Sequence, residues 1–422
     1  MSRNETASIL AGVGARARDA ATALRVATTG QKNAALNAAA DAVAAHKDEI
    51  LAANARDVEA AKANGVSGAM LDRLKIDGAR FEGVVQAIRD VAALPDPVGE
   101  VIESWERLNG LNISRVRTPI GVIAMIYESR PNVTTDAASI CVKSGNAVIL
   151  RGGSEAFETS SALHNCFVEG LAKAGLPADA VQFVQTTDRA AVGEILAGLD
   201  GAVDLIIPRG GKTLVARVQR EARAPVLGHL EGVCHVYVDG GADIEKAVNI
   251  VVNAKMRRTG VCGSAETVLI DRKVLGSHWP AISKALREAG CEIRADADIR
   301  KIDAEAKPAT EEDFYTEYLD AIIAAAVVDG VKGAAMHIAK YGTGHTDSIL
   351  TEDEAAARYF LDNVDSAIVM QNASTQFADG GEFGLGAEIG IATGRLHARG
   401  PVGVRELTTY KNVVRGTGQT RP

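Results

Sequence analysis

Residues 120–155 read IGVIAMIYESRPNVTTDAASICVKSGNAVILRGGSE, and this stretch decides the fold that we expect. The apolar run Ile120–Tyr127 precedes a segment typical of a helix, residues 132–142, and a second apolar run follows at Ala147–Leu150. A strand, a helix and a strand in this order predict two parallel strands with a helix covering the sheet. A glycine pair, Gly152-Gly153, comes directly after the second strand.

The same alternation continues toward the C-terminus. Apolar runs that we interpret as strands recur with helical stretches between them. The first series continues with Val181–Val184, Val203–Ile207 and His235–Val238. A second series of the same kind follows, with Thr267–Ile270, Ile322–Val328 and Ala367–Met370. We therefore predict an α/β protein with two parallel-sheet domains and a C-terminal tail.

The chain before residue 120 has a different pattern. The stretch from Gln31 to Ala63 is rich in strong helix formers and ends at Asn64-Gly65, which predicts a helix. Between Trp105 and Pro119, alternating residues flank Asn109-Gly110. An Asn-Gly pair in that setting predicts a β-hairpin.

Composition limits the class of protein. The 422 residues carry 46 basic and 54 acidic side chains, a net charge of −8 that argues against nucleic acid as a partner. The five cysteines are widely spaced without a C-x-x-C pair, so neither a disulfide framework nor a zinc site is expected. No signal peptide and no membrane helix is recognisable. We expect a soluble, cytoplasmic protein that does not bind membranes.

Two glycine pairs are candidates for nucleotide binding. Arg151-Gly152-Gly153-Ser154 and Arg209-Gly210-Gly211 each follow a predicted strand and precede a predicted helix. Ligands of open parallel sheets bind at the carboxyl ends of the strands, where helix N-termini offer free N–H groups to phosphate. Ordinary strand-to-helix turns would have the same pattern, but two pairs in one sheet favour a dinucleotide.

Cys262 is the candidate nucleophile. It lies between glycines in Arg258-Thr-Gly-Val-Cys-Gly-Ser264, a setting that suits an accessible thiolate. The local sequence leaves the alternative of a small buried hydrophobic residue open. We expect no metal site, because His229 and His235 lie six residues apart without a third ligand. His345, in a glycine-rich polar loop, is the one histidine that stays a candidate.

Five segments together carry a family resemblance: YESRPNVT (127–134), KSGN (143–146), RTGVC (258–262), YGTGHTD (341–347) and LHARGPVG (396–403). In these motifs and their order, the chain resembles the gamma-glutamyl phosphate reductases, also called glutamate-5-semialdehyde dehydrogenases, of the aldehyde dehydrogenase superfamily. The resemblance covers nearly the whole chain. It implies an aldehyde dehydrogenase-like α/β fold with two Rossmann-like domains and a small β-flap for oligomerisation.

The resemblance also implies domain boundaries and partners. The NADP-binding domain would comprise residues 1–104 and 120–232, the catalytic domain residues 233–375, the flap residues 105–119 and 404–422, and a crossing segment that lines the active site residues 376–403. A homodimer or homotetramer is implied. The enzyme would act after a separate glutamate kinase, and an association with that kinase is conceivable on the same grounds.

The implied reaction is the NADPH-dependent reduction of L-glutamyl 5-phosphate to L-glutamate 5-semialdehyde and phosphate, the second step of proline biosynthesis. Cys262 would form a thioester, and the Asn132 amide with the Cys262 N–H would bind the oxyanion. The residues implied for NADP(H) are Lys143, Arg151, Ser154, Arg209, Gly210 and Gly211. Basic residues after the strand Ala147–Leu150 favour NADP over NAD, although Glu155 lies close by.

Two points stay open in this interpretation. The candidates for substrate binding are Arg130, Arg258 and His345, and each could equally be a surface ion-pair or structural residue. Hydrolysing relatives carry a glutamate base whose place falls near Gly228 here, and only Glu231 is close. The alternatives are therefore a non-phosphorylating semialdehyde dehydrogenase, with Glu231 as base, or a non-catalytic oligomeric scaffold of the same fold.

Overall fold

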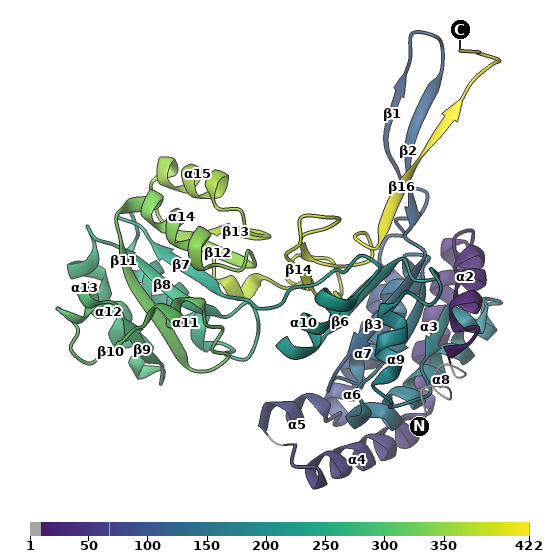
Figure 1. Ribbon diagram of the computed structural model, residues 1–422, viewed down its shortest axis with the longest axis horizontal. Helices are drawn as coiled ribbons and strands as arrows, with labels where there is room; N and C mark the ends of the chain where they lie inside the picture. Colours follow the sequence, from purple (N-terminus) through teal and green to yellow (C-terminus); the bar gives the residue numbers. More distant parts are fainter. Residues whose placement is uncertain (1–9, 67, 422) are drawn as a thin grey trace. The chain divides into compact units, whose positions relative to one another are not determined.

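The structure is a computed structural model of the chain, and it describes residues 10–66 and 68–421. These residues form two compact units (Figure 1). Unit 1 comprises the described residues up to Gly228, the segment Gly384–Gly390 and the residues from Val402 onward, and unit 2 comprises His229–Phe383 and Ile391–Pro401.

Unit 1 is built around a four-stranded parallel sheet with the strand order β5-β4-β3-β6. Its strands are β3 (Val122–Tyr127), β4 (Ala147–Arg151), β5 (Val181–Phe183) and β6 (Leu205–Arg209). The helices that follow them are α7 (Asn132–Lys143), α8 (Phe157–Lys173), α9 (Ala190–Leu196) and α10 (Lys212–Glu221). Because β3 and β4 pair in parallel and are buried throughout, the strand–helix–strand unit predicted from residues 120–155 is confirmed.

Helices precede this sheet in the described part of unit 1, among them α2 (Val13–Leu24), α3 (Thr29–Ala45), α4 (Lys47–Ala63), α5 (Gly68–Leu74) and α6 (Gly78–Ala93). The prediction of one continuous helix from Gln31 to Ala63 is wrong, because His46 leaves the helical conformation (φ −94°, ψ 21°) and divides it. Helix α8 packs closely on α3, where a Cβ on Gly170 would lie 2.5 Å from the Ala39 amide nitrogen.

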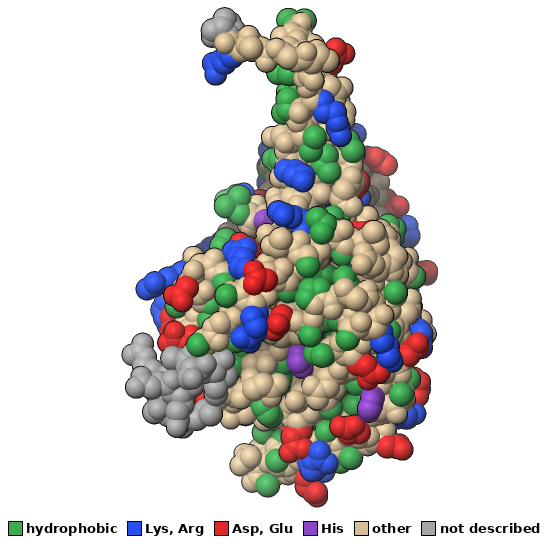
Figure 2. All heavy atoms as spheres, turned by 90° about the vertical axis from the view of Figure 1, so that its right-hand side faces the viewer, with side chains coloured by type: hydrophobic (Ala, Val, Ile, Leu, Met, Phe, Trp, Pro, Cys, Tyr) green, Lys and Arg blue, Asp and Glu red, His purple; other side chains and the backbone are tan. Residues whose placement is uncertain are grey.

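A three-stranded antiparallel sheet extends away from the rest of unit 1 (Figure 1). We call it the flap; it consists of β1 (Val101–Glu106), β2 (Asn112–Pro119) and β16 (Thr408–Arg415), with β2 in the middle. Trp105 pairs with Ile113 across the turn, so the hairpin predicted at Asn109-Gly110 is confirmed. Hydrophobic side chains are exposed along the flap (Figure 2), on both outer strands β1 and β16.

Unit 2 is built around a seven-stranded parallel sheet with the order β10-β9-β11-β8-β7-β12-β13. The strands are β7 (Cys234–Val238), β8 (Ala265–Asp271), β9 (Glu292–Ala295), β10 (Lys307–Pro308), β11 (Ile322–Val328), β12 (Thr346–Leu350) and β13 (Ile368–Gln371). Its helices are α11 (Ile244–Met256), α12 (Leu275–Glu288), α13 (Ala297–Arg300), α14 (Gly330–Tyr341) and α15 (Glu354–Asn363). A two-stranded ribbon, β14 (Ile391–Ala392) with β15 (Gly400–Pro401), completes the unit.

The two faces of this sheet carry separate cores. Val236 and Val238 belong to the core that includes Trp279 of α12, whereas Tyr237, between them, belongs to the core that includes Phe360 of α15. Successive side chains of a strand point to opposite faces, so this division means that helices cover the sheet on both sides.

Two strand assignments differ from the sequence analysis. The strand His235–Val238, which the pattern places in the first series, pairs with β8 and β12 of the second sheet. The residues Thr346–Leu350 form a buried strand, β12, where the sequence suggests only a polar loop. Its polar residues are buried against neighbouring strands, which periodicity could not indicate. Among the described residues, no helix is long and apolar enough to span a membrane.

Candidate active site

Cys262 lies in the loop that connects α11 to β8. All five cysteines fall within the described part of the chain, and of these Cys262 alone is partly exposed; the others are buried, namely Cys141, Cys166, Cys234 and Cys291. Burial raises the pKa of each of those four thiols, to about 11 for Cys166 and about 12 for Cys291. They therefore stay protonated near neutral pH, which leaves Cys262 as the candidate nucleophile.

Two glycines let other segments approach the backbone of this loop closely. A Cβ on Gly232 would overlap the carbonyl oxygen of Cys262. A Cβ on Gly263 would lie 3.0 Å from the carbonyl oxygen of Thr375. The cysteine loop is thus packed between the segment before β7 and the segment after β13, and residues with side chains would push it out of place.

Hydrogen bonds anchor both ends of the loop. The side-chain amide of Gln376 donates to the carbonyl oxygens of Ala254, at 2.9 Å, and Arg258, at 3.1 Å. Lys255 and Glu266, on either side of the loop, form a fully buried ion pair with 2.6 Å between Nζ and Oε2. The loop that carries Cys262 is therefore anchored to its surroundings by contacts at its start and across its two ends.

Two imidazoles lie beside the cysteine. A ring nitrogen of His229, the sulfur of Cys262 and a ring nitrogen of His345 lie within 4.8 Å of one another. The two imidazole rings meet edge to face, with their centroids 4.7 Å apart. His345 is buried directly before β12. Its Nδ1 lies 2.9 Å from Thr346 Oγ1 and 3.5 Å from Cys234 Sγ. The candidate His345 thus lies beside Cys262, together with His229, which sequence reasoning had set aside.

The other candidates in unit 2 lie along the same segments. Arg258 is on the cysteine loop, with its side chain exposed. Glu231 is partly buried and directly precedes Gly232, whose backbone packs on Cys262. The alternative in which Glu231 acts as a base therefore remains geometrically open.

In unit 1, the carboxyl ends of three strands carry the candidates for nucleotide binding. Ile126 of β3 pairs with Arg151 of β4, and Tyr127 pairs with Arg209 of β6. The register therefore places both arginines at one edge of the sheet, beside Glu128. This edge is where open parallel sheets bind their ligands.

The side chains around β4 are already engaged. The guanidinium of Arg151 is buried and donates to the carbonyl oxygens of Gly152, at 2.6 Å, and Thr187, at 3.0 Å. The carboxylate of Glu155 accepts hydrogen bonds from the backbone N–H and the hydroxyl of Ser129. Ser154, at the start of a short 3-10 helix, is exposed at this edge.

Gly210 and Gly211 form the entry to α10. The Gly211 N–H donates to Glu128 Oε2 at 3.2 Å, and a Cβ on Gly210 would lie 2.5 Å from the same oxygen. A carboxylate oxygen therefore occupies the place at this helix N-terminus that a phosphate oxygen would take. Backbone N–H groups at a helix N-terminus suit a phosphate group, so the entry to α10 is the candidate place for a dinucleotide pyrophosphate.

Asn132 is the first residue of α7, and its side-chain Nδ2 donates to Asp136 Oδ2 at 2.9 Å. Burial raises the pKa of Asp136 to about 6, against the opposing effects of this hydrogen bond and of the charges of Arg209 and Arg130. Asn132 and Arg130 thus belong to one electrostatic group at the carboxyl edge of the sheet. Sequence reasoning did not find Asp136, although it lies one helical turn after Asn132.

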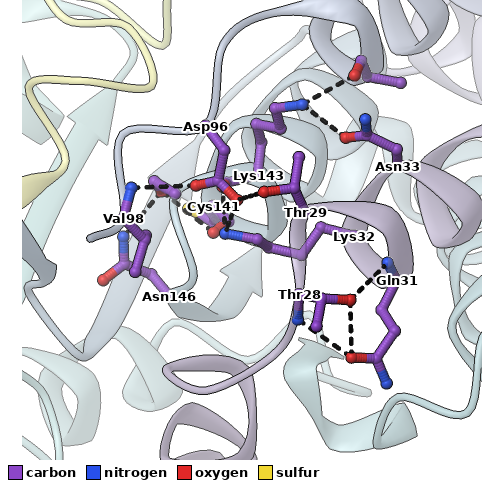
Figure 3. Close-up of polar contacts among 12 residues, drawn as sticks. Thr28, Thr29, Gln31, Lys32, Asn33, Asp96, Val98, Cys141, Lys143 and Asn146 are labelled. Atoms are coloured by element: carbon purple, nitrogen blue, oxygen red, sulfur yellow. Dashed lines mark hydrogen bonds and ion pairs between the residues drawn. The ribbon is translucent and has the colours of Figure 1, made fainter. Parts of the chain in front are cut away.

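Lys143 does not lie at this edge. It ends α7 and precedes the amino end of β4, whereas Arg151 is at the carboxyl end, roughly 15 Å away at about 3.3 Å per strand residue. Its ammonium is fully buried and donates to Asn33 Oδ1, at 2.5 Å, and to the Ala92 carbonyl, at 2.8 Å. Figure 3 shows Lys143 pointing toward Asn33, near the Lys32–Asp96 ion pair. We therefore correct its assignment from a cofactor contact to a residue that ties α7 to α3 and α6.

Besides Asp136, three residues that help build the site escaped sequence reasoning: His229, Gly232 and Gln376. The segment GHLEG, 228–232, gave one usable signal, since a polar stretch bounded by glycines before a strand is typical of a binding loop. No comparable signal marked Gln376, which acts through long-range hydrogen bonds.

Comparison with known proteins gives the class of this chain. The model of the aldehyde dehydrogenase family matches residues 4–327. Together with the two parallel-sheet units and the exposed cysteine loop, this match places the chain in the aldehyde dehydrogenase family.

Two bacterial relatives and one solved structure narrow the class. Proteins named gamma-glutamyl phosphate reductase from Caulobacter vibrioides and Mesorhizobium japonicum are 65% identical over 413 residues and 59% identical over 421 residues. These matches cover 98% and 100% of this chain, and 100% and 98% of the relatives. The crystal structure of gamma-glutamyl phosphate reductase from Thermotoga maritima matches with a TM-score of 0.96 and 46% identity, over 98% of this chain and 100% of that one. Within its class, the chain belongs to the gamma-glutamyl phosphate reductases, as its motifs predicted.

Proposed function

We propose that this protein reduces L-glutamyl 5-phosphate to L-glutamate 5-semialdehyde and phosphate with NADPH, as a step of proline biosynthesis. The observation that carries the proposal is the single partly exposed cysteine among five, held between glycines on an anchored loop. Membership of the gamma-glutamyl phosphate reductases supports the choice of substrate. We assign cofactor binding to unit 1 and the nucleophile to unit 2.

Cys262 is the nucleophile in this proposal. Its thiolate attacks the acyl carbon of the substrate, the bond between that carbon and the phosphate oxygen breaks, and phosphate leaves. A thioester forms on Cys262, so one difficult reduction becomes two easier steps. After reduction, the thiohemiacetal collapses to the aldehyde and restores the thiolate.

Each tetrahedral species needs a partner for its oxyanion. We assign this role to the Asn132 side-chain amide and the backbone N–H of Cys262. The hydrogen bond from Asn132 Nδ2 to Asp136 supports the assignment for Asn132, since it orients the amide. Arg130, Arg258 and His345 stay candidates for binding the glutamyl group or the phosphate.

NADPH, when bound, supplies the hydride. We propose that Gly210, Gly211, Arg209, Ser154 and Arg151 hold it at the carboxyl edge of the unit 1 sheet. The Gly211 N–H with its carboxylate oxygen supports a pyrophosphate at α10. The engagement of Glu155 with Ser129 leaves it unsuited to bind a ribose hydroxyl, which favours NADP over NAD.

The test starts from the reverse reaction, with the semialdehyde, NADP⁺ and the purified protein. Turnover that requires inorganic phosphate supports the proposal, whereas turnover without phosphate overturns it in favour of a non-phosphorylating dehydrogenase. In that second case, Glu231→Gln should abolish the rate, because a base would then have to activate water.

Cys262→Ser separates catalysis from a scaffold role. We expect a loss in kcat/KM of roughly 1,000-fold or more with an unchanged melting temperature. The matched control is Cys291→Ala, a buried thiol outside the site, which should keep its activity. A Cys262→Ser protein that turns over at the wild-type rate would remove the cysteine from the mechanism.

A further inference from the structure

The group formed by His229, Cys262 and His345 is built from three separate segments. His229 precedes β7, Cys262 precedes β8 and His345 precedes β12, which are neighbouring strands of one sheet. One nitrogen of each ring and the cysteine sulfur lie within 4.8 Å of one another. A thiolate and two imidazoles are the ligands that zinc prefers in proteins.

The orientation of His229 suits a metal ligand. Its Nδ1 lies 2.6 Å from the carbonyl oxygen of Ile391, so Nδ1 carries the proton and donates it to that oxygen. The tautomer is thereby fixed with the lone pair on Nε2. Histidines that bind metals are commonly oriented by such a hydrogen bond to a backbone carbonyl.

His345 provides the second, independent observation. Its ring is completely buried, and its Nδ1 faces Thr346 Oγ1. Its Nε2 is buried without a hydrogen-bond partner. Leaving a buried polar atom unsatisfied costs about 1–3 kcal/mol. A ligand on that nitrogen would remove the cost.

We propose that His229, Cys262 and His345 form a site that reversibly binds Zn²⁺, with a water molecule in the fourth position. Tetrahedral coordination with Zn–S near 2.3 Å and Zn–N near 2.0 Å needs ligand atoms about 3.5 Å apart. The three ligand atoms lie within 4.8 Å of one another, so side-chain rotation has to bring them to this shorter distance. Cys262, being partly exposed, has room to move.

Binding uses the nucleophile as a ligand. The thiol proton of Cys262 goes to solvent, a bond forms between sulfur and the metal, and nothing is oxidised or reduced. Coordination lowers the nucleophilicity of the sulfur and blocks its approach to the acyl phosphate, so we expect the bound protein to be inactive and a chelator to restore it. This consequence rests on the proposed function, whereas the binding itself does not.

Co²⁺ is the probe for the site, added to untagged protein under reducing conditions. A thiolate bound to Co²⁺ gives a charge-transfer band in the near ultraviolet, and tetrahedral Co²⁺ gives visible bands. We expect one Co²⁺ per chain, displaced by one Zn²⁺. Cys262→Ser should lose the charge-transfer band, and His229→Ala or His345→Gln should weaken binding by roughly 10-fold or more.

His46→Ala is the matched control, because His46 is an exposed histidine of unit 1. It should bind Co²⁺ like the wild-type protein. A charge-transfer band that survives in Cys262→Ser, or wild-type affinity in both folded His229 and His345 variants, would overturn the site. If the spectra follow expectation but Zn²⁺ leaves the reductase rate unchanged, the metal site stands and the role of Cys262 falls.

Discussion

At the scale of the residue, Asp136 controls the group on which the proposed oxyanion site depends. Its carboxylate accepts the hydrogen bond from Asn132 Nδ2, and its pKa of about 6 means that it is mostly ionised at neutral pH. A bond to an ionised acceptor is stronger than one to a neutral acceptor. Asp136 is thus a positioning residue for Asn132.

Protonation of Asp136 should therefore slow the enzyme. We expect kcat to fall about 10-fold as the pH drops through 6, since a loosened amide binds the oxyanion less well. Asp136→Asn, which resembles the protonated form, should be slow at every pH and should lack the inflection near pH 6. The measurement is a pH–rate profile of both proteins.

The effect of Asp136 on stability changes with pH in the opposite direction to its effect on activity. The native pKa of Asp136, about 6, lies above its ordinary value of 3.8, so the folded state binds more protons between these values. This group therefore stabilises the fold less as the pH rises from about 4 to 6. Asp19→Asn, at an exposed position of α2, is the control for the pH–rate profile. If the inflection near pH 6 in that profile persists in Asp136→Asn, the assignment of Asp136 is contradicted.

At the scale of the element, the loop between α11 and β8 depends on the buried pair of Lys255 and Glu266. Both side chains are completely buried, and burial raises the pKa of Glu266 to about 7 despite the opposing charge of Lys255. Removing Lys255 leaves the carboxyl group of Glu266 buried in the protein without its ion-pair partner. Lys255→Met should therefore lower the free energy of unfolding by about 3–5 kcal/mol, as measured by urea denaturation.

The double variant Lys255→Met, Glu266→Leu tests whether the unpaired carboxyl group causes this destabilisation. It should recover much of the lost free energy of unfolding, because no unpaired ionisable group stays buried. Lys246→Met breaks the exposed pair with Glu352 and should leave the urea midpoint nearly unchanged. If Lys255→Met behaved like Lys246→Met, the pair would not hold the cysteine loop.

The elements also differ in how far the sequence predicts them. The hairpin at Asn109-Gly110 depends on a turn whose geometry two adjacent residues set, and it is confirmed. The division of the first long helix at His46 depends on packing, and helix propensity gave no sign of it. Strand β12 was missed because polar residues such as Asp347 and Ser348 are buried by their neighbours in the sheet.

At the scale of the whole molecule, the flap is the surface that a second copy of the chain should cover. Val101, Ile102, Tyr410 and Val414 are all exposed on it. Exposed hydrophobic side chains on a sheet whose outer strands have unpaired edges favour association. We propose that the protein is a homo-oligomer assembled through this flap.

Introducing charge on the flap should dissociate the assembly. Val101→Glu with Val414→Glu should lower the molar mass in light scattering toward the 44.1 kDa of one chain, since a buried carboxylate would be unpaired. Val26→Glu, at a position that is 76% exposed outside the flap, is the control and should keep the wild-type mass. An unchanged mass in the flap variant would place the interface elsewhere.

The sequence by itself determined the class of fold and the family, and it singled out Cys262 as the candidate nucleophile. These depend on local patterns: the alternation of strands and helices, glycines beside Cys262, and motifs of four to eight residues. Only the tertiary structure decided which side chains meet. It moved Lys143 to a buried network with Asn33, and it brought His229 and His345 to the cysteine. The physical reason is that contacts between residues distant in the chain are created by strand order and packing, and no spacing in the sequence encodes them.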